Sequence, residues 1–196
     1  MNISEFLVEK HKIRAHYRKE RAALSNEARE LLDIAICANL SELPVIKKAD
    51  TILVYYPVKN EPNIRPLIRT LFSSCKRVAF PVSNSDDCTL TFKYVESLDD
   101  MVLGTYNIPE PSKNAKVVVD FSNCVCIVPA LVFDRHGYRI GYGKGYYDRF
   151  LKHFQGKSIG IAYSQFVVDN LPYEPTDVAV DIIITERGII LPHEKE

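Results

Sequence analysis

Short apolar runs alternate with helical segments through most of this 196-residue sequence, and that alternation constrains the fold more than any other feature. The runs that read as strands are 51–57, 77–81, 89–95, 124–133, 157–163, 178–186 and 188–192. Residues 63–75 and 143–154, between such runs, read as helices. Strands separated by helices indicate an α/β fold. We therefore predict a three-layer α/β sandwich around a mixed, mainly parallel sheet, in a single domain spanning residues 1–196.

The charge balance and the lengths of the apolar runs exclude several classes of protein. Twenty-five Lys and Arg balance 25 Asp and Glu, so the chain has no net charge to attract nucleic acid or an anionic membrane. No apolar run approaches the ~20 residues of a membrane span. The first 24 residues also lack the apolar core of a signal peptide. We expect a cytoplasmic monomer whose partners are small molecules, not nucleic acid or a membrane.

The cysteines indicate a reducing compartment. There are five, an odd number, without C-x-x-C spacing: Cys37, Cys75, Cys88, Cys124 and Cys126. Cys124 and Cys126 alternate on one face of a predicted strand, where free cysteines act as small core residues. This pattern favours a packing role for the cysteines over metal or redox chemistry. Free cysteines of this kind are typical of proteins in the reducing cytosol.

Residues 3–23 are predicted to form a helix with a basic face. Its cations recur at spacings of three and four, which places them on one side: Lys10, Arg14, Arg18 and Arg21. Such a face is either solvated or a site for anions. Ser25 then has the position of an N-cap for a second helix.

The stretch RIGYGKGYYDRF, residues 139–150, follows a predicted strand and runs into a predicted helix, where open α/β sheets place their ligands. Three glycines allow the backbone to approach a ligand: Gly141, Gly143 and Gly145. The amides of such a turn, with Lys144 and Arg139, suit a phosphate. Asp148 has the chemistry to hold a divalent cation, or to cap the helix. Tyrosines within the stretch offer flat rings for a planar ligand. Many glycine-rich turns bind nothing, so these residues alone leave phosphate binding open.

A longer block, VPALVFDRHGYRIGYGKGYYDRFL at 128–151, contains this stretch. Four other pieces accompany it in order: KHKIR at 10–14, YYPVKNEPN at 55–63, IPEP at 108–111 and LPYEPTDVAVDIIITE at 171–186. With these motifs the sequence resembles the 5-formyltetrahydrofolate cyclo-ligases, also called methenyltetrahydrofolate synthetases. The resemblance implies an α/β fold similar to that of sugar-phosphate isomerases and coenzyme A transferases. It also implies an ATP-dependent ligase of folate one-carbon metabolism, which converts 5-formyltetrahydrofolate to 5,10-methenyltetrahydrofolate with magnesium present and releases ADP and phosphate.

The resemblance also implies roles for particular residues. The positions that match ATP-binding residues are Lys10, Arg14, Arg139, Ile140, Gly141, Tyr142, Gly143, Lys144, Gly145, Tyr146 and Tyr147. Those that match folate-binding residues are Tyr56, Glu61, Tyr142, Gly143, Lys144, Gly145 and Tyr146. Asp148 and Asp181 match the magnesium ligands. Asp181 lies in an otherwise apolar run, where a carboxylate is costly unless it is paired or bound to metal. Asp177, four residues earlier, is assigned to a loop.

No Ser–His–acid or Cys–His pattern accompanies these motifs, and phosphoryl transfer needs mainly positioning and charge neutralisation. Lys144 and Arg139 are therefore the predicted catalytic residues, acting on the charge of the transferring phosphoryl group. Two alternatives stay open. One is another small α/β enzyme that grips a phosphorylated substrate, and the other is a non-catalytic folate- or nucleotide-binding module, which could dispense with Asp148 and Asp181.

Overall fold

A central sheet of seven strands organises the chain, and a computed structural model describes residues 3–193 of it. The strand order is β12-β11-β9-β6-β1-β2-β3. Its strands are β1 (Thr51–Leu53), β2 (Arg77–Asn84), β3 (Thr89–Val95), β6 (Cys124–Pro129), β9 (Lys157–Ile161), β11 (Ile182–Thr185) and β12 (Gly188–Ile190). The five inner strands run parallel, and the edge strands β3 and β12 pair antiparallel. The prediction of a mixed, mainly parallel sheet is confirmed.

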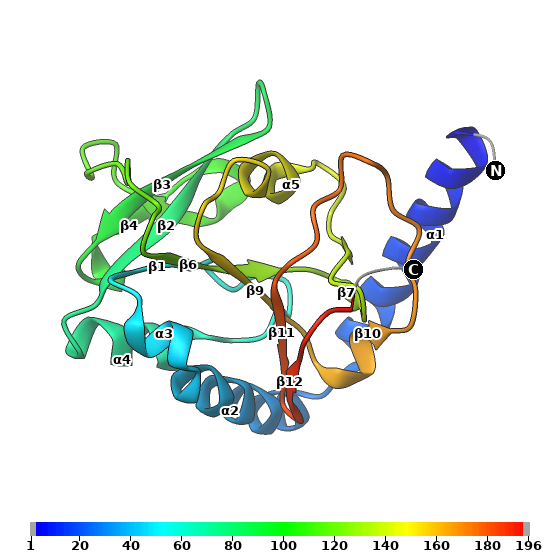
Figure 1. Ribbon diagram of the computed structural model, residues 1–196, viewed down its shortest axis with the longest axis horizontal. Helices are drawn as coiled ribbons and strands as arrows, with labels where there is room; N and C mark the ends of the chain where they lie inside the picture. Colours follow the sequence, from blue (N-terminus) through cyan, green and yellow to red (C-terminus); the bar gives the residue numbers. More distant parts are fainter. Residues whose placement is uncertain (1–2, 194–196) are drawn as a thin grey trace.

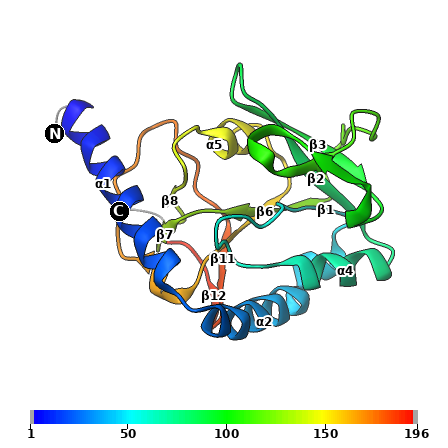
Figure 2. The same cartoon turned by 180° about the vertical axis from the view of Figure 1, so that it is seen from behind.

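Helices cover both faces of this sheet, as Figures 1 and 2 show from opposite sides. One face carries α2 (Asn26–Glu42), α3 (Pro44–Lys48) and α4 (Arg65–Ser73), and the other carries α5 (Tyr146–Leu151). The long helix α1 (Ile3–Ala23) lies to one side, next to a small sheet. The predicted cap is present, since the Ser25 hydroxyl accepts a hydrogen bond from the Ala28 amide at 3.1 Å.

Two smaller sheets flank the central one. The first, in the order β10-β7-β8, joins Val167–Val168, Val132–Asp134 and Arg139–Ile140. The second is the hairpin of β4 (Met101–Leu103) and β5 (Pro109–Pro111). Three short 3-10 helices, Leu98–Asp100, Thr105–Asn107 and Ser164–Phe166, complete the described elements. Both small sheets border the carboxyl ends of the parallel strands, so they shape the site described below.

The core lies between the central sheet and its helices, and the inner strands are buried on both faces. Ile52, Val125, Ile127, Ile159 and Ile183 are each at most 1% exposed. This explains why these strands read as continuous apolar runs, without polar alternation. Cys124 and Cys126 are buried free thiols within this core, as predicted from their alternation. Within residues 3–193, no helix has both the length and the apolar composition required to cross a membrane.

Among the elements that differ from the sequence prediction, three shape the site. β1 ends at Leu53, so residues 54–57 leave the sheet. The run 124–133 divides into β6 and β7 at residues 130–131. The helix predicted for 143–154 begins only at Tyr146, because Gly145 has a left-handed backbone (φ 69°) that cannot be part of a helix, and it ends at Leu151.

Candidate active site

A cavity of about 710 Å³ opens beyond the carboxyl ends of the inner strands. Its lining includes Tyr55 just after β1, Ser83 near the end of β2 and Ala130 just after β6. The other walls come from α1, the glycine loop at 141–145, the β4–β5 hairpin and the segment 174–177. This is the edge at which open α/β sheets usually bind ligands.

The glycine loop passes through the middle of the cavity wall and is held by α1. Gly143 has φ 95°, a conformation that residues with a side chain rarely adopt. A Cβ at that position would also lie 3.1 Å from Cζ of Arg14. Nε of Arg14 donates to the carbonyl of Gly141 at 3.2 Å. Glycine at 143 therefore lets helix and loop approach closely.

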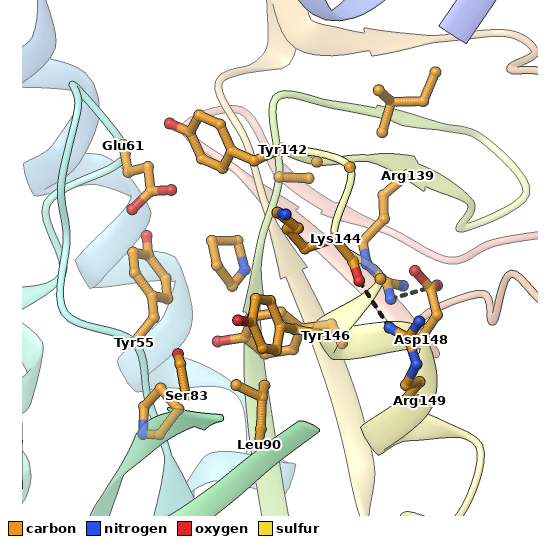
Figure 3. Close-up of a pocket in the computed structure, with 18 of the residues that line it drawn as sticks. Tyr55, Glu61, Ser83, Leu90, Arg139, Tyr142, Lys144, Tyr146, Asp148 and Arg149 are labelled. Atoms are coloured by element: carbon orange, nitrogen blue, oxygen red, sulfur yellow. Dashed lines mark hydrogen bonds and ion pairs between the residues drawn. The ribbon is translucent and has the colours of Figure 1, made fainter. Parts of the chain in front are cut away.

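One end of the cavity is charged, as Figure 3 shows on the side of Asp148. Nη2 of Arg139 donates to Oδ1 of Asp148 at 2.7 Å, and Nη1 donates to the carbonyl of Val178 at 2.6 Å. The Val178 amide donates to the same Asp148 oxygen at 3.2 Å. The Arg139 side chain is only 5% exposed. Burial lowers the pKa of Arg139, and the charge of Asp148 opposes this effect.

Lys10 forms a second cation–carboxylate group at this end. Its ammonium is 2.6 Å from Oδ2 of Asp177 and 3.1 Å from Oε2 of Glu174. Asp177 Oδ2 also accepts the Glu174 amide at 2.9 Å. These contacts fix the amino-terminal half of α1 against the segment 174–177.

Two further cations at this end belong to the glycine loop and α5. Lys144 is exposed, lines the cavity and forms no ion pair within the described part of the chain. Arg149 donates to the carbonyl of Lys144 at 2.7 Å. The ammonium of Lys144 is thus available to an anionic ligand, whereas Arg139 is engaged by protein groups.

Glu61 defines the opposite end of the cavity. The residue is 7% exposed, and its Oε2 accepts the Val58 amide at 3.0 Å. Burial raises the pKa of Glu61 to about 7, although the Val58 hydrogen bond and the charges of Arg21 and Lys59 act against the rise. The hydroxyl of Tyr55, drawn beside Glu61 in Figure 3, donates to the carbonyl of Pro62 at 2.6 Å.

Aromatic rings connect the two ends. Tyr142 lies at the Glu61 end, and burial together with the charge of Glu61 raises the pKa of Tyr142. Nζ of Lys59 is 5.0 Å and Cζ of Arg18 is 5.2 Å from the centre of the Tyr142 ring. Tyr56 also lines the cavity, with Cζ of Arg65 5.6 Å from its ring centre.

The β4–β5 hairpin closes one side of the cavity. At its tip Tyr106 has φ 60°, an uncommon conformation for a bulky residue. The hydroxyls of Tyr106 and Tyr146 lie 3.1 Å apart, which joins the hairpin to the start of α5. At the hairpin's base the buried Glu110 accepts the Ser83 amide at 3.1 Å.

The structure does not bring Asp181 to this cavity. Asp181 directly precedes β11, so it lies at the amino ends of the parallel strands, away from the cavity. Its carboxylate accepts hydrogen bonds from Lys157 at 2.8 Å and from the amide and hydroxyl of Ser158 at 2.8 and 2.7 Å. Burial alone would raise the pKa of Asp181, but these hydrogen bonds outweigh it and lower the pKa. The costly carboxylate in an apolar run is thus satisfied by protein groups.

All the other predicted site residues line the cavity, and charged residues without a predicted role also lie at or beside it. Asp177 and Lys59 are in its lining, and Arg21 lies directly behind Tyr142. The helical spacing had placed Arg21 on the basic face without a role. Nothing in the sequence indicates that Asp177 meets Lys10, which lies 167 residues away in the chain.

Residues 7–186 match the model of the 5-formyltetrahydrofolate cyclo-ligase family. The chain belongs to this family. Among curated relatives, the Escherichia coli 5-formyltetrahydrofolate cyclo-ligase is 29% identical over 177 residues, covering 88% of this chain and 97% of the relative. The enzyme of the same name from Mycoplasma pneumoniae is 31% identical over 190 residues, covering 92% and 100%.

Solved structures of the family share this fold. The 5,10-methenyltetrahydrofolate synthetase of Aquifex aeolicus superposes with a TM-score of 0.83 at 31% identity, covering 95% of this chain and 94% of that one. The Mycoplasma pneumoniae synthetase gives 0.74 at 29% identity, covering 91% and 99%. These findings confirm the family resemblance and the enzyme class. The expected likeness to sugar-phosphate isomerases and coenzyme A transferases stays a prediction.

Proposed function

We propose that this cyclo-ligase family member converts 5-formyltetrahydrofolate to 5,10-methenyltetrahydrofolate while ATP becomes ADP and phosphate. One observation carries the proposal: a single cavity has a cation-rich end and a Glu61 end, joined by the glycine loop. The negative charge of a triphosphate matches the cation-rich end, and the N–H groups of a pterin ring match the Glu61 end. Placing both in one cavity brings the reacting groups together, which is the main requirement of phosphoryl transfer.

ATP occupies the charged end in this proposal. Arg14 and Lys144 supply positive charge for the phosphates, Lys10 adds a third cation that Asp177 and Glu174 hold in place, and the amides of the glycine loop add donors for phosphate oxygens. Lys144 acts on the transferring phosphoryl group because its ammonium is exposed in the cavity. Arg139, the other predicted catalytic residue, chiefly orients Asp148 and the Val178 carbonyl.

The folate occupies the Glu61 end. Ionised Glu61 accepts hydrogen bonds from the N–H groups of the pterin ring, and the rings of Tyr56 and Tyr142 pack against it. The raised pKa of Glu61 means that this carboxylate ionises near neutral pH, so folate binding depends on pH in the physiological range.

Magnesium fits beside Asp148 and Asp177. Each uses one carboxylate oxygen for the bonds described above, and the other oxygen has no hydrogen bond within residues 3–193. In the same residues no group of three or more His, Cys, Asp or Glu side chains is placed to hold a metal alone. Magnesium commonly takes one or two carboxylates, together with water and phosphate oxygens. When bound, it would neutralise phosphate charge. Asp177 thus replaces Asp181 in this proposal.

The chemistry requires activation of an amide-like formyl group. The γ-phosphoryl group moves from ATP to the formyl oxygen, and ADP is released. The neighbouring folate nitrogen then attacks the formyl carbon, loses its proton, and the C–O bond breaks to release phosphate. The protein positions the two substrates and stabilises charge, and no protein nucleophile takes part.

The test is the absorbance of methenyl-folate after purified protein is mixed with 5-formyltetrahydrofolate, ATP and magnesium. We expect the band to grow with all components present and to stay absent when ATP is omitted. Growth without ATP would contradict the role of the charged end. No growth, with both ligands shown to bind, would favour the non-catalytic binding module.

A further inference from the structure

Arg21 is a buried cation whose bonding the proposed site does not explain. It lies on α1, its side chain is buried, and the residue is 2% exposed. Within residues 3–193 it forms no ion pair with a carboxylate. Removing a guanidinium from water without a directly bound carboxylate is costly, so its hydrogen bonds need an explanation.

The donors of Arg21 reach two neutral acceptors on two different segments. Nη1 donates to the carbonyl of Ala130 at 3.0 Å, just beyond the carboxyl end of β6. Nη2 donates to the hydroxyl of Tyr142, in the glycine loop. The planar fork of arginine suits this task, because two fixed donors hold both acceptors in one geometry. Arg21 therefore joins the glycine loop to the end of the sheet.

Tyr142 requires such support because of its neighbours in sequence. It lies between glycines at 141 and 143, which restrict the backbone little. Arg14 holds the loop by the Gly141 carbonyl, and Arg21, seven residues later on the same face of α1, holds it by the Tyr142 side chain. Two turns of a helix span ~10 Å, so one rigid element fixes both the backbone and the ring.

We propose that Arg21 is a positioning residue that holds the Tyr142 ring at the Glu61 end for folate binding. The inference rests on the proposed function, which places the pterin there. Arg21 itself does not line the cavity, so it acts through Tyr142. Without the bond, the ring swings within a glycine-flanked loop, and ordering it again weakens folate binding. Lys10 and Lys144 are untouched, so ATP binding stays nearly unchanged.

The experiment measures binding of 5-formyltetrahydrofolate, and separately of magnesium-ATP, by titration calorimetry. Arg21→Met removes the donors and keeps the apolar stem, whereas Tyr142→Phe removes the acceptor and keeps the ring. We expect each change to weaken folate binding by about 10-fold, the order for a lost hydrogen bond to a charged group. The double variant should bind no more weakly than Arg21→Met, because both changes remove one interaction. Arg21→Lys, which keeps one donor group, should fall between wild type and Arg21→Met.

Lys19→Met is the matched control, since Lys19 is an exposed cation on the same helix with the same charge. It should leave folate binding unchanged within about two-fold. If the wild-type protein binds folate and either Arg21→Met or Tyr142→Phe binds it with the same affinity, the inference is overturned. Additive losses in the double variant would also overturn it. If Arg21→Met does not fold, Tyr142→Phe against wild type still decides. Absence of folate binding by the wild-type protein would instead overturn the proposed function, and this inference with it.

Discussion

Asp148 and Glu61 line opposite ends of the same cavity, and their surroundings differ. Asp148 contacts Arg139 at 2.7 Å and the Val178 amide at 3.2 Å, so a cation is bound directly to it. Glu61 has the Val58 amide as its hydrogen-bond donor, while Arg21 and Lys59 act on it through charge alone. Burial without a directly bound cation raises the pKa of Glu61 to about 7. The carboxylate at one end of the cavity is therefore bound directly to a cation, whereas the carboxylate at the other end is buried with a raised pKa.

The largest expected effect comes from removing charge at the Asp148 end. Lys144→Met should lower kcat by about 100- to 1,000-fold, the usual loss when one group that stabilises transition-state charge is removed. Folate binding should change by less than about three-fold, because the Glu61 end is untouched. Steady-state kinetics and calorimetry measure both quantities. Lys48→Met, an exposed lysine at the end of α3, is the control for charge. Intact turnover in Lys144→Met would exclude the catalytic role.

Asp148→Asn should lower stability, in addition to weakening the binding of magnesium-ATP that the proposed magnesium role implies. The change leaves Arg139, 5% exposed, without its carboxylate, and removing one partner of a buried ion pair costs roughly 3 kcal/mol. Denaturant unfolding with and without magnesium-ATP measures the loss. Asp169→Asn is the control, because Asp169 pairs with Arg135 at an exposed site and should cost under about 1 kcal/mol. Equal losses of unfolding free energy in the two variants would mean that the buried Asp148–Arg139 pair contributes no more to stability than an exposed pair.

The sequence allowed the order of strands and helices to be predicted, because buried parallel strands read as apolar runs. The Ser25 cap and the glycine loop were predictable too, because each depends on residue types that are adjacent in the sequence. Tertiary contacts decided the remainder. The run 124–133 divides at Ala130, where β7 pairs with a small sheet and the Ala130 carbonyl accepts a bond from Arg21, more than 100 residues away. Asp181 appeared to belong inside a strand, and only the observed start of β11 at Ile182 places it at the opposite edge from the cavity.

Folate binding at the Glu61 end should depend on pH, because burial raises the pKa of Glu61 to about 7. If ionised Glu61 binds the pterin, a pKa of about 7 implies that folate affinity rises roughly 10-fold from pH 6 to pH 8. Glu61→Gln should bind more weakly at pH 8 and lose most of this dependence. Calorimetry at several pH values tests this. The same slope in both proteins would assign the titration to another group.

The ionisation of Glu61 should also affect stability, but in the opposite direction: stability should fall as the pH rises, whereas folate affinity should increase. Folded Glu61 keeps its proton up to about pH 7, whereas the unfolded residue releases it near 4.5. The folded state binds more protons between these values, so this contribution is full below 4.5 and is lost as the pH rises to about 7. Melting temperatures should therefore decline across this window more steeply for wild type than for Glu61→Gln. Parallel curves would contradict the raised pKa.

The smallest expected change in stability is that of Tyr147→Phe, at a residue that lies between the two ends of the cavity. The charges of Glu61 and Arg139 both reach it, yet its buried hydroxyl has no hydrogen-bond partner within residues 3–193. A buried, unsatisfied hydroxyl is unfavourable, so Tyr147→Phe should leave stability unchanged or raise it by roughly 1 kcal/mol. Tyr163→Phe is the matched control, since it loses a 2.8 Å hydrogen bond to Asp33 and should be destabilised by about the same amount. Calorimetric melts compare the two variants. A drop in ATP affinity of more than about three-fold in Tyr147→Phe would mean that this hydroxyl turns toward the nucleotide. Tyr147 would then make a polar contact with the ligand at the charged end, in addition to its apolar packing between the two ends.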